Sequence, residues 1–174
     1  SAGGEVLAIP GDAGVKDDVE AMFKQVLDTW GTVDILVNNA ALRREKPFAE
    51  MSYAAWREVL DVTLDGTFLC VKACLPALRR SGAATIVNIG GLSAHTGAKN
   101  RAHVVTAKAG IIGLTRALAH DLADDGITVN CVCPGWTNTS LVDFDRIGVR
   151  SGVTADEARA RAEADNAQRR VLEP

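Results

Sequence analysis

The chain has 174 residues, of which 47% are hydrophobic and 24% are charged, and its formal net charge is −3. This length and composition suit one soluble globular domain. No apolar run is long enough to span a bilayer, and a net negative charge without Lys/Arg runs argues against nucleic acid or a membrane surface as a partner.

The first predicted strand and turn cover residues 5–12, a short apolar run that Gly11 and Asp12 end. Apolar residues at helical spacing then predict a helix over about 17–29. Residues 33–39 are almost continuously apolar, which is typical of a parallel strand covered on both faces. A polar loop over 40–50 follows.

The spacing predicts one long helix over 52–79, with Ser52 as its N-cap. The next buried strand covers 85–91. A further helix covers 101–123, and Asn100 is its candidate cap. The small residues Ala109, Gly113 and Ala117 lie four apart on this helix and favour close approach by another helix, either inside the fold or between subunits.

Residues 127–135 form the last predicted strand, and the loop over 136–153 is long enough to be a lid. Thr154 and Glu157 make a capping box that begins a final helix to about Arg170. Strands that alternate with helices predict an α/β fold with a parallel sheet.

The four cysteines lie in predicted regular structure: Cys70 and Cys74 on a helix, and Cys131 and Cys133 on a strand. Zinc sites usually place cysteine pairs in tight turns. We therefore expect small buried side chains in a reducing, cytoplasmic protein, and no metal site.

Lys108 lies near the start of the helix over 101–123, between two predicted strands that end in glycine-containing turns. Ligands of open α/β sheets bind at the carboxyl ends of the strands. The sequence therefore predicts a cation at the ligand crevice.

Five segments carry a resemblance to a known family. They are GDAG at 11–14, DILVNNA at 34–40, IVNIGG at 86–91, AKAGIIGLTRALAHDLA at 107–123 and ITVNCVCPGWTNT at 127–139. In this order and spacing the chain resembles the short-chain dehydrogenase/reductase family. The resemblance implies a single Rossmann-like NAD(P)-binding domain over 1–174, with a doubly wound parallel sheet and helices on both faces.

The same resemblance implies that the domain is incomplete at both ends. The family's opening strand, glycine-rich phosphate turn, second strand and last strand have no counterpart here. In the strand order 3-2-1-4-5-6, residues 5–12 would not neighbour residues 33–39. We therefore expect an internal piece of a longer protein and predict that these residues alone form no stable monomer, which a sharp cooperative melt would disprove.

The family's catalytic set is depleted. The resemblance implies an active site with a Tyr-x-x-x-Lys pair, a serine that hydrogen-bonds the substrate carbonyl, and an asparagine that holds a water. Here Lys108 matches the lysine. The tyrosine position is Val104, the serine position is Gly91 and the asparagine position is Thr63.

Several nearby residues are candidate replacements. His103 has a suitable pKa, but residues 103 and 108 differ by about 140° around a helix, so an interface role is the alternative. Ser93 and His95 either face substrate or are solvated loop residues. The hydroxyl of Thr63 either replaces the asparagine in part or bonds its own turn.

The resemblance also implies the cofactor contacts. Asp12 and Ala13 would contact the adenine, and the backbone of Asn39 and Ala40 would line the adenosine ribose. Ile89 and Lys108 would meet the nicotinamide ribose. The carboxamide side would be met by Pro134, Gly135, Thr137 and Thr139. The cofactor is NAD or NADP, and this sequence leaves the choice open.

We therefore expect an oxidoreductase that transfers hydride between NAD(P)(H) and a small alcohol or carbonyl substrate at an atypical site. The alternative is a catalytically silent nucleotide-binding or scaffold subunit of the same fold. By resemblance, the helices over 52–79 and 101–123 would form the interfaces of a homodimer or homotetramer.

Overall fold

The computed structural model describes residues 3–140 and 142–173. They form two compact units, one that runs to Val132 and one that begins at Cys133. Within these ranges, no helix is both long enough and apolar enough to cross a membrane.

The first unit is built on a three-stranded parallel sheet. Its strands are β1 (Ile35–Asn38), β2 (Thr85–Ile89) and β3 (Thr128–Val132), and they lie in the order β1-β2-β3. Leu36 lies beside Ile86, which lies beside Val129. This arrangement confirms the predicted α/β class with a parallel, Rossmann-like sheet.

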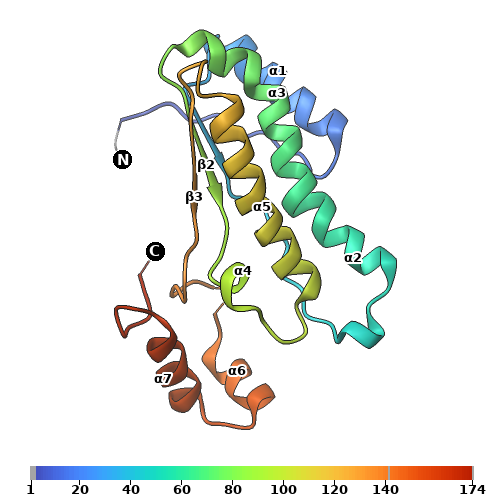
Figure 1. Ribbon diagram of the computed structural model, residues 1–174, viewed down its shortest axis with the longest axis vertical. Helices are drawn as coiled ribbons and strands as arrows, with labels where there is room; N and C mark the ends of the chain where they lie inside the picture. The colour runs from blue at the N-terminus through green and yellow to red at the C-terminus, as the bar shows by residue number, and fades with distance from the viewer. Residues whose placement is uncertain (1–2, 141, 174) are drawn as a thin grey trace. The chain divides into compact units, whose positions relative to one another are not determined.

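Helices follow the strands as the alternation predicts (Figure 1). Elements α1 (Lys16–Trp30), α2 (Tyr53–Leu60), α3 (Gly66–Ser81) and α5 (Ala102–Asp121) are the long ones. A 3-10 turn, Phe48–Glu50, precedes α2, and the short helix α4 (Ser93–Thr96) follows β2. Helix α3 packs against β1 and β2, and α5 packs against β2 and β3.

The main hydrophobic core lies between the sheet and these helices. Alternate strand residues Leu36, Ile86 and Val129 point into it, because successive side chains of a strand point to opposite faces. Helix α3 contributes Val71 and Leu78. Burying such side chains stabilises the fold by about 1.5–3 kcal/mol each.

The opposite face of the sheet is open in the described residues. Ile35 is 65% exposed, Val37 is 54% exposed and Val132 is 50% exposed. The expectation that residues 33–39 are covered on both faces is therefore met on one face only. An apolar run shows that a strand can be buried, but not which elements cover it. Here the helices α3 and α5 cover one face of the sheet.

A buried chain of polar side chains ties the sheet to α5. Asn38 Nδ2 donates to Asn88 Oδ1 over 2.8 Å, and Asn88 Nδ2 donates to Thr115 Oγ1 over 2.9 Å. Thr115 Oγ1 in turn donates to the Ile111 carbonyl over 2.7 Å. Asn88 has no exposed surface. The chain satisfies groups that would otherwise cost free energy inside the core.

The prediction of a strand over residues 5–12 is wrong. Residues 4–12 belong to no helix or strand. A strand needs an adjacent partner for its N–H and C=O groups, and none of the described strands lies beside it.

The long helix over 52–79 is present as α2, a π-helical segment Asp61–Asp65, and α3. Ser52 caps it as predicted, because its Oγ accepts from the Ala55 N–H over 3.1 Å. The predicted cap of α5 is wrong. Asn100 has a φ of 61°, and the N-cap is Arg101, whose side chain makes no capping bond.

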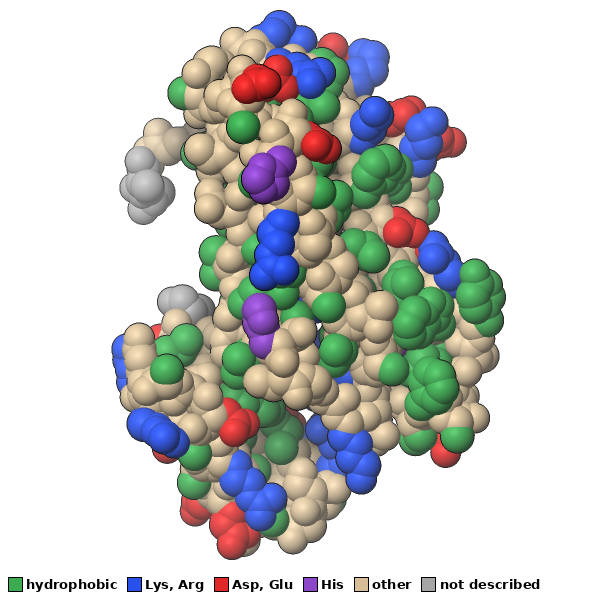
Figure 2. Space-filling view, viewed as in Figure 1, with side chains coloured by type: hydrophobic (Ala, Val, Ile, Leu, Met, Phe, Trp, Pro, Cys, Tyr) green, Lys and Arg blue, Asp and Glu red, His purple; other side chains and the backbone are tan. Residues whose placement is uncertain are grey.

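Hydrophobic side chains gather on the outer surface over α2 and the start of α3 (Figure 2). Phe48 is 75% exposed, Tyr53 is 77% exposed and Phe68 is 52% exposed. Apolar groups that cluster on a surface often mark a contact with another molecule.

The second unit contains α6 (Phe144–Ser151) and α7 (Ala155–Asp165), which pack on each other. The capping box is confirmed, because Thr154 Oγ1 accepts from the Glu157 N–H and the Glu157 carboxylate accepts from the Thr154 N–H. Two expectations need correction. The segment 136–153 is not only a loop, since it contains α6, and the last helix ends at Asp165 rather than near Arg170. Asn166 leaves helical backbone there, with a ψ of 135°.

Candidate functional site

Lys108 lies at the carboxyl end of the sheet, as the sequence predicts. Its Nζ donates to the backbone carbonyl oxygen of Ile89, the last residue of β2, over 2.5 Å. The side chain is half-buried on α5. A charge-assisted hydrogen bond of this kind fixes the ammonium group beside the strand end.

Ser93 lies close to the position that the family's serine would occupy. A Cβ atom built on Gly91 would be 3.9 Å from Ser93 Oγ. The short helix α4 brings this hydroxyl back toward Gly91, because the Ala94 N–H donates to the Gly91 carbonyl over 3.0 Å. His95, at the same helix, is exposed. Sequence spacing alone could not show that Ser93 Oγ lies near Gly91.

Thr63 is fully buried within the π-helical segment Asp61–Asp65. Its Oγ1 accepts a hydrogen bond from the Leu42 N–H over 3.2 Å, so it anchors the loop that follows β1. The hydroxyl that bonds back to its own turn belongs to Thr67, which donates to the Thr63 carbonyl over 2.9 Å. π-Helical segments inside α-helices frequently lie at functional sites.

His103 is 1% exposed, and its Nδ1 is the buried side-chain nitrogen that finds no hydrogen-bond partner within the described residues. Burial lowers the pKa of the His103 imidazole, while the Arg101 backbone opposes that shift. Glu58 raises and Arg44 lowers the same pKa by weaker charge effects. This burial within the chain's own fold leaves almost none of His103 for a substrate or a second subunit to contact.

Val104 stands in place of the family's tyrosine and is 8% exposed. It packs in a second apolar cluster with Val59, Leu60 and Ala107. Valine has no ionisable group, so this position supplies no proton. The cluster explains what the residue does instead: it joins α5 to α2.

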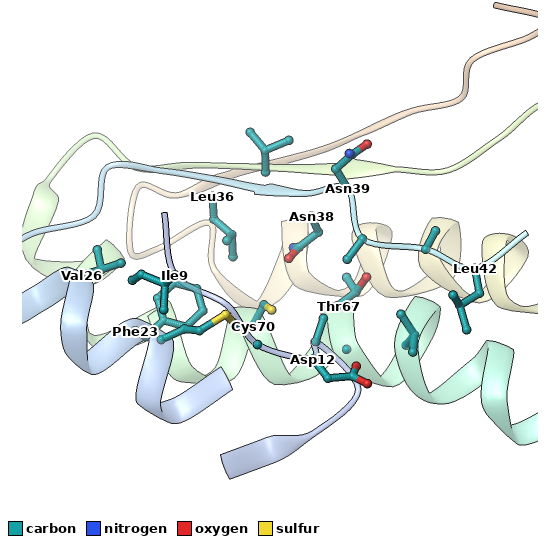
Figure 3. A pocket seen from close by; sticks show the side chains of 18 of the residues that line it. Ile9, Asp12, Phe23, Val26, Leu36, Asn38, Asn39, Leu42, Thr67 and Cys70 are labelled. Atoms are coloured by element: carbon teal, nitrogen blue, oxygen red, sulfur yellow. The ribbon is translucent and has the colours of Figure 1, made fainter. Parts of the chain in front are cut away.

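A pocket of about 940 Å³ lies between the segment around Asp12 and the end of β1 (Figure 3). Four of the expected cofactor residues line it: Asp12, Ala13, Asn39 and Ala40. Its size falls within the range of about 300–1,000 Å³ that is usual for ligand pockets.

The backbone around Asp12 is held at the edge of this pocket by local contacts. Asp12 is held in a turn, because its Oδ1 accepts from the Gly14 N–H over 2.8 Å and its own N–H donates to Asp18 over 2.9 Å. A Cβ on Gly66 would be 2.8 Å from the Ala13 carbonyl, so only glycine lets α3 approach this segment. These contacts therefore fix Asp12 and Ala13 in place at the edge of the pocket.

Two charged residues of the pocket were missed by the sequence analysis. Arg44 and Glu58 line it, and Arg44 Nη2 donates to Glu58 Oε1 over 2.9 Å. In the sequence both are ordinary charged residues, and only their common place in the pocket lining identifies them. Arg44 was a part of the polar loop that follows the Asn-Asn-Ala segment, which is the one signal that pointed to it.

The remaining expected cofactor residues belong to the second unit. They are Pro134, Gly135, Thr137 and Thr139. Thr137 pairs with Leu172 as an isolated parallel bridge. A Cβ on Gly135 would be 2.1 Å from Asn166 Oδ1, so no larger residue fits beside that side chain.

The cysteines on α3 have the expected character. Cys74 has no exposed surface, and burial raises the pKa of its thiol to about 12, with a smaller contribution from Cys70. Burial also raises the pKa of the Cys70 thiol. Neither thiol is poised to react, since the thiolate is the reactive form.

Comparison with known proteins now identifies the family. The family model described as Enoyl-(Acyl carrier protein) reductase matches residues 1–174. A 3-oxoacyl-[acyl-carrier-protein] reductase of Staphylococcus aureus is 36% identical over 141 residues, which are 81% of this chain and 57% of that protein. A reductase of the same name from Synechocystis sp. is also 36% identical over the same shares.

A third relative has a different name. The (2S)-[(R)-hydroxy(phenyl)methyl]succinyl-CoA dehydrogenase subunit BbsD of Thauera aromatica is 42% identical over 141 residues, which are 81% of this chain and 56% of that protein. The chain thus spans somewhat more than half the length of these relatives. With a family match over its whole length, the chain belongs to the short-chain dehydrogenase/reductase family.

Proposed function

We propose that this chain is the core of an NAD(P)-dependent oxidoreductase that transfers hydride between the nicotinamide cofactor and a small alcohol or carbonyl substrate. The observation that carries the proposal is the position of Lys108 Nζ, 2.5 Å from the Ile89 carbonyl at the end of β2. In open α/β sheets, this end of the strands is where ligands bind. Membership of the family supports the same chemistry.

The proposed cofactor contacts follow the family pattern. Asp12 and Ala13 would hold the adenine, and Asn39 and Ala40 the adenosine ribose. Ile89 and Lys108 would meet the nicotinamide ribose. The carboxamide side would be met by Pro134, Gly135, Thr137 and Thr139. When bound, the nicotinamide ring supplies or accepts the hydride. The pocket that Asp12, Ala13, Asn39 and Ala40 line supports the adenosine part of this proposal.

We infer that Ser93 replaces the missing serine. Its hydroxyl, 3.9 Å from the Cβ position of Gly91, is near enough to serve a substrate oxygen that the Gly91 position itself cannot contact. Thr63 would stabilise the site through its bond to the Leu42 N–H rather than through a water. These residues supply no evident proton donor. Val104 is apolar and His103 is buried, so the family's usual donor position holds no acid.

The substrate class to test first comes from the names of the relatives. Two of them are 3-oxoacyl-[acyl-carrier-protein] reductases, and the third is a dehydrogenase of a succinyl-CoA thioester. We propose a β-oxo or β-hydroxy acyl thioester, whose carbonyl or alcohol carbon exchanges the hydride.

We also propose a cytoplasmic homodimer or homotetramer with no nucleic-acid or membrane partner. The small stripe of α5 supports an interface between subunits, because Ala109, Gly113 and Ala117 are all exposed. Nothing lies within 4 Å of a Cβ built on Gly113. The exposed Phe48, Tyr53 and Phe68 add apolar surface that a partner subunit would cover.

A silent nucleotide-binding or scaffold subunit is the second candidate. The observation that favours it is the burial of Val104 in an apolar cluster. Val104 preserves the packing of α2 on α5, but it cannot donate a proton. Loss of a general acid typically lowers the rate by about 10²–10⁴-fold. Residual turnover would then separate the two candidates.

Cofactor fluorescence followed by turnover measurements tests the proposal. The protein should bind NADH or NADPH and then oxidise it with a 3-oxoacyl thioester, and Ser93→Ala should lower kcat while leaving the Kd for cofactor unchanged. Turnover abolished by His103→Ala would restore the histidine to the mechanism. Binding without turnover on a panel of ketones and thioesters would favour the silent subunit, and no binding would reject both.

A further inference from the structure

Asn166 makes an unusually complete set of hydrogen bonds for a side chain that follows a helix. It lies directly after α7, and only 5% of it is exposed. Its Oδ1 accepts from the Trp136 N–H over 2.9 Å, and its Nδ2 donates to the Trp136 carbonyl over 2.9 Å. Nδ2 also donates to the Arg170 carbonyl over 2.8 Å. The carboxamide thus pairs with both backbone groups of Trp136, as a neighbouring strand would.

The Asn166 side chain leaves no room for a Cβ atom at position 135. A Cβ on Gly135 would be 2.1 Å from Asn166 Oδ1, far inside any real contact distance. The backbone of Gly135 is not in the left-handed region, so glycine is needed here for space rather than for conformational freedom. Asn166 and Gly135 are therefore two halves of one arrangement.

Leu172 also holds this segment, and its N–H shares the Trp136 carbonyl with Asn166. The Leu172 N–H donates to the Trp136 carbonyl over 2.9 Å, and the Asn138 N–H donates to the Leu172 carbonyl over 2.7 Å. The segment from Gly135 to Asn138 is therefore fixed between a side chain that follows α7 and a strand-like contact with Leu172.

We propose that Asn166 is a positioning residue that holds the segment Gly135–Asn138 in one conformation and so presents Thr137 to the nicotinamide carboxamide. This inference rests on the proposed function for the role of Thr137. Only a carboxamide offers a donor and an acceptor that match a peptide group. Aspartate would place a carboxylate against two carbonyl oxygens, and alanine would leave the Trp136 N–H without this partner.

Variants of Asn166 test the arrangement by two readouts, one of which needs no cofactor. Peptide-resolved hydrogen exchange should show faster exchange at Trp136 in Asn166→Ala and in Asn166→Asp, by about tenfold for the loss of one or two hydrogen bonds. The Kd for cofactor should rise by a similar factor while kcat changes less. The matched control is Gln168→Ala, because that amide only accepts from the Arg170 side chain.

The isosteric variant separates positioning from packing. If Asn166 only fills space, the Asn166→Asp variant should match the wild type in hydrogen exchange at Trp136 and in the Kd for cofactor. This result would overturn the proposal. Unchanged hydrogen exchange at Trp136 in Asn166→Ala would also overturn it.

A double-mutant cycle with Gly135 gives the sharpest outcome. Gly135→Ala should displace Asn166 and weaken cofactor binding, but it should cost nothing further in an Asn166→Ala background, where the space is free. Additive losses of affinity would overturn the proposal, because they would mean that Gly135 is needed for close approach of the cofactor and not for Asn166. If the wild type binds neither NADH nor NADPH, the proposed function fails and the presenting role fails with it. The exchange readout still decides whether Asn166 holds the segment.

Discussion

Lys108 Nζ donates a hydrogen bond across 2.5 Å to the backbone carbonyl oxygen of Ile89, and this contact joins helix α5 to the carboxyl end of β2. It fixes a cation at the end of β2. In the family's pattern the tyrosine position is Val104 and the serine position is Gly91, so the proposed function combines a cofactor lysine with an altered proton chemistry.

Restoring the tyrosine should restore rate. Val104→Tyr places a phenol four residues before Lys108, and we expect turnover to rise by about 10²–10⁴-fold, the usual contribution of a general acid. Steady-state kinetics with cofactor and a 3-oxoacyl thioester measures this gain.

Val104→Phe is the matched control. Val104 is 8% exposed, so either large residue overpacks the cluster at a cost of about 1–3 kcal/mol in the free energy of unfolding. Phenylalanine has nearly the same size as tyrosine, so it should have the same cost in stability, but it has no hydroxyl group to donate a proton. Equal rates for the two variants would show that the tyrosine position does not face the reacting atoms.

The buried Asn88 should matter for stability more than for chemistry. Asn88→Ala removes the acceptor of Asn38 Nδ2 and the donor to Thr115 Oγ1. Leaving a buried donor unpaired costs about 1–3 kcal/mol, and we expect the free energy of unfolding to fall by at least that amount. Chemical denaturation measures it.

Asn130→Ala is the control for this variant, since Asn130 is exposed on the neighbouring strand β3. Its effect should stay within about 0.5 kcal/mol. A similarly small effect for Asn88→Ala would mean that the polar chain from Asn38 to Thr115 contributes little to the fold.

The buried His103 predicts a loss of stability at acidic pH. Burial lowers its pKa in the folded state below the ordinary value of about 6.5. The unfolded chain therefore binds more protons, and the free energy of unfolding falls as the pH drops from about 6.5 toward the lower folded pKa.

His103→Leu should remove that part of the pH dependence and also the unpaired Nδ1. Denaturant unfolding between about pH 7.5 and pH 5 measures the slope, which His120→Gln should leave intact because His120 is exposed. A wild-type slope that persists in His103→Leu would assign the acid sensitivity to carboxylates instead.

Local pattern predicted the elements whose determinants are local. The strand β2, helix α5 and the capping box of Thr154 and Glu157 all follow from apolar spacing and from side chains that reach their own backbone. Residues 5–12 carried the same apolar signal as β2. They form no ladder, because a strand is defined by a partner that the signal does not contain.

The location of Lys108 at the strand end, and the common location of Asp12, Ala13, Asn39 and Ala40 beside one pocket, were predictable because family segments fix the spacing. Ser93 needed the structure, because only the turn of α4 shows that its hydroxyl comes back toward Gly91. Asn166 could not be found from sequence. Its three backbone partners lie at Trp136 and Arg170, and an asparagine after a helix is an ordinary residue until those partners are known.

Titration of the protein with NADH and with NADPH, followed by cofactor fluorescence and repeated on Lys108→Met, shows whether Lys108 holds a nicotinamide cofactor. We predict saturable binding of at least one cofactor. Loss of a charge-assisted hydrogen bond worth about 1.5–3 kcal/mol should raise the Kd by roughly 10- to 100-fold in Lys108→Met, and Lys108→Arg should raise it less. Absence of binding by the wild type, or an unchanged Kd in Lys108→Met, would contradict the account.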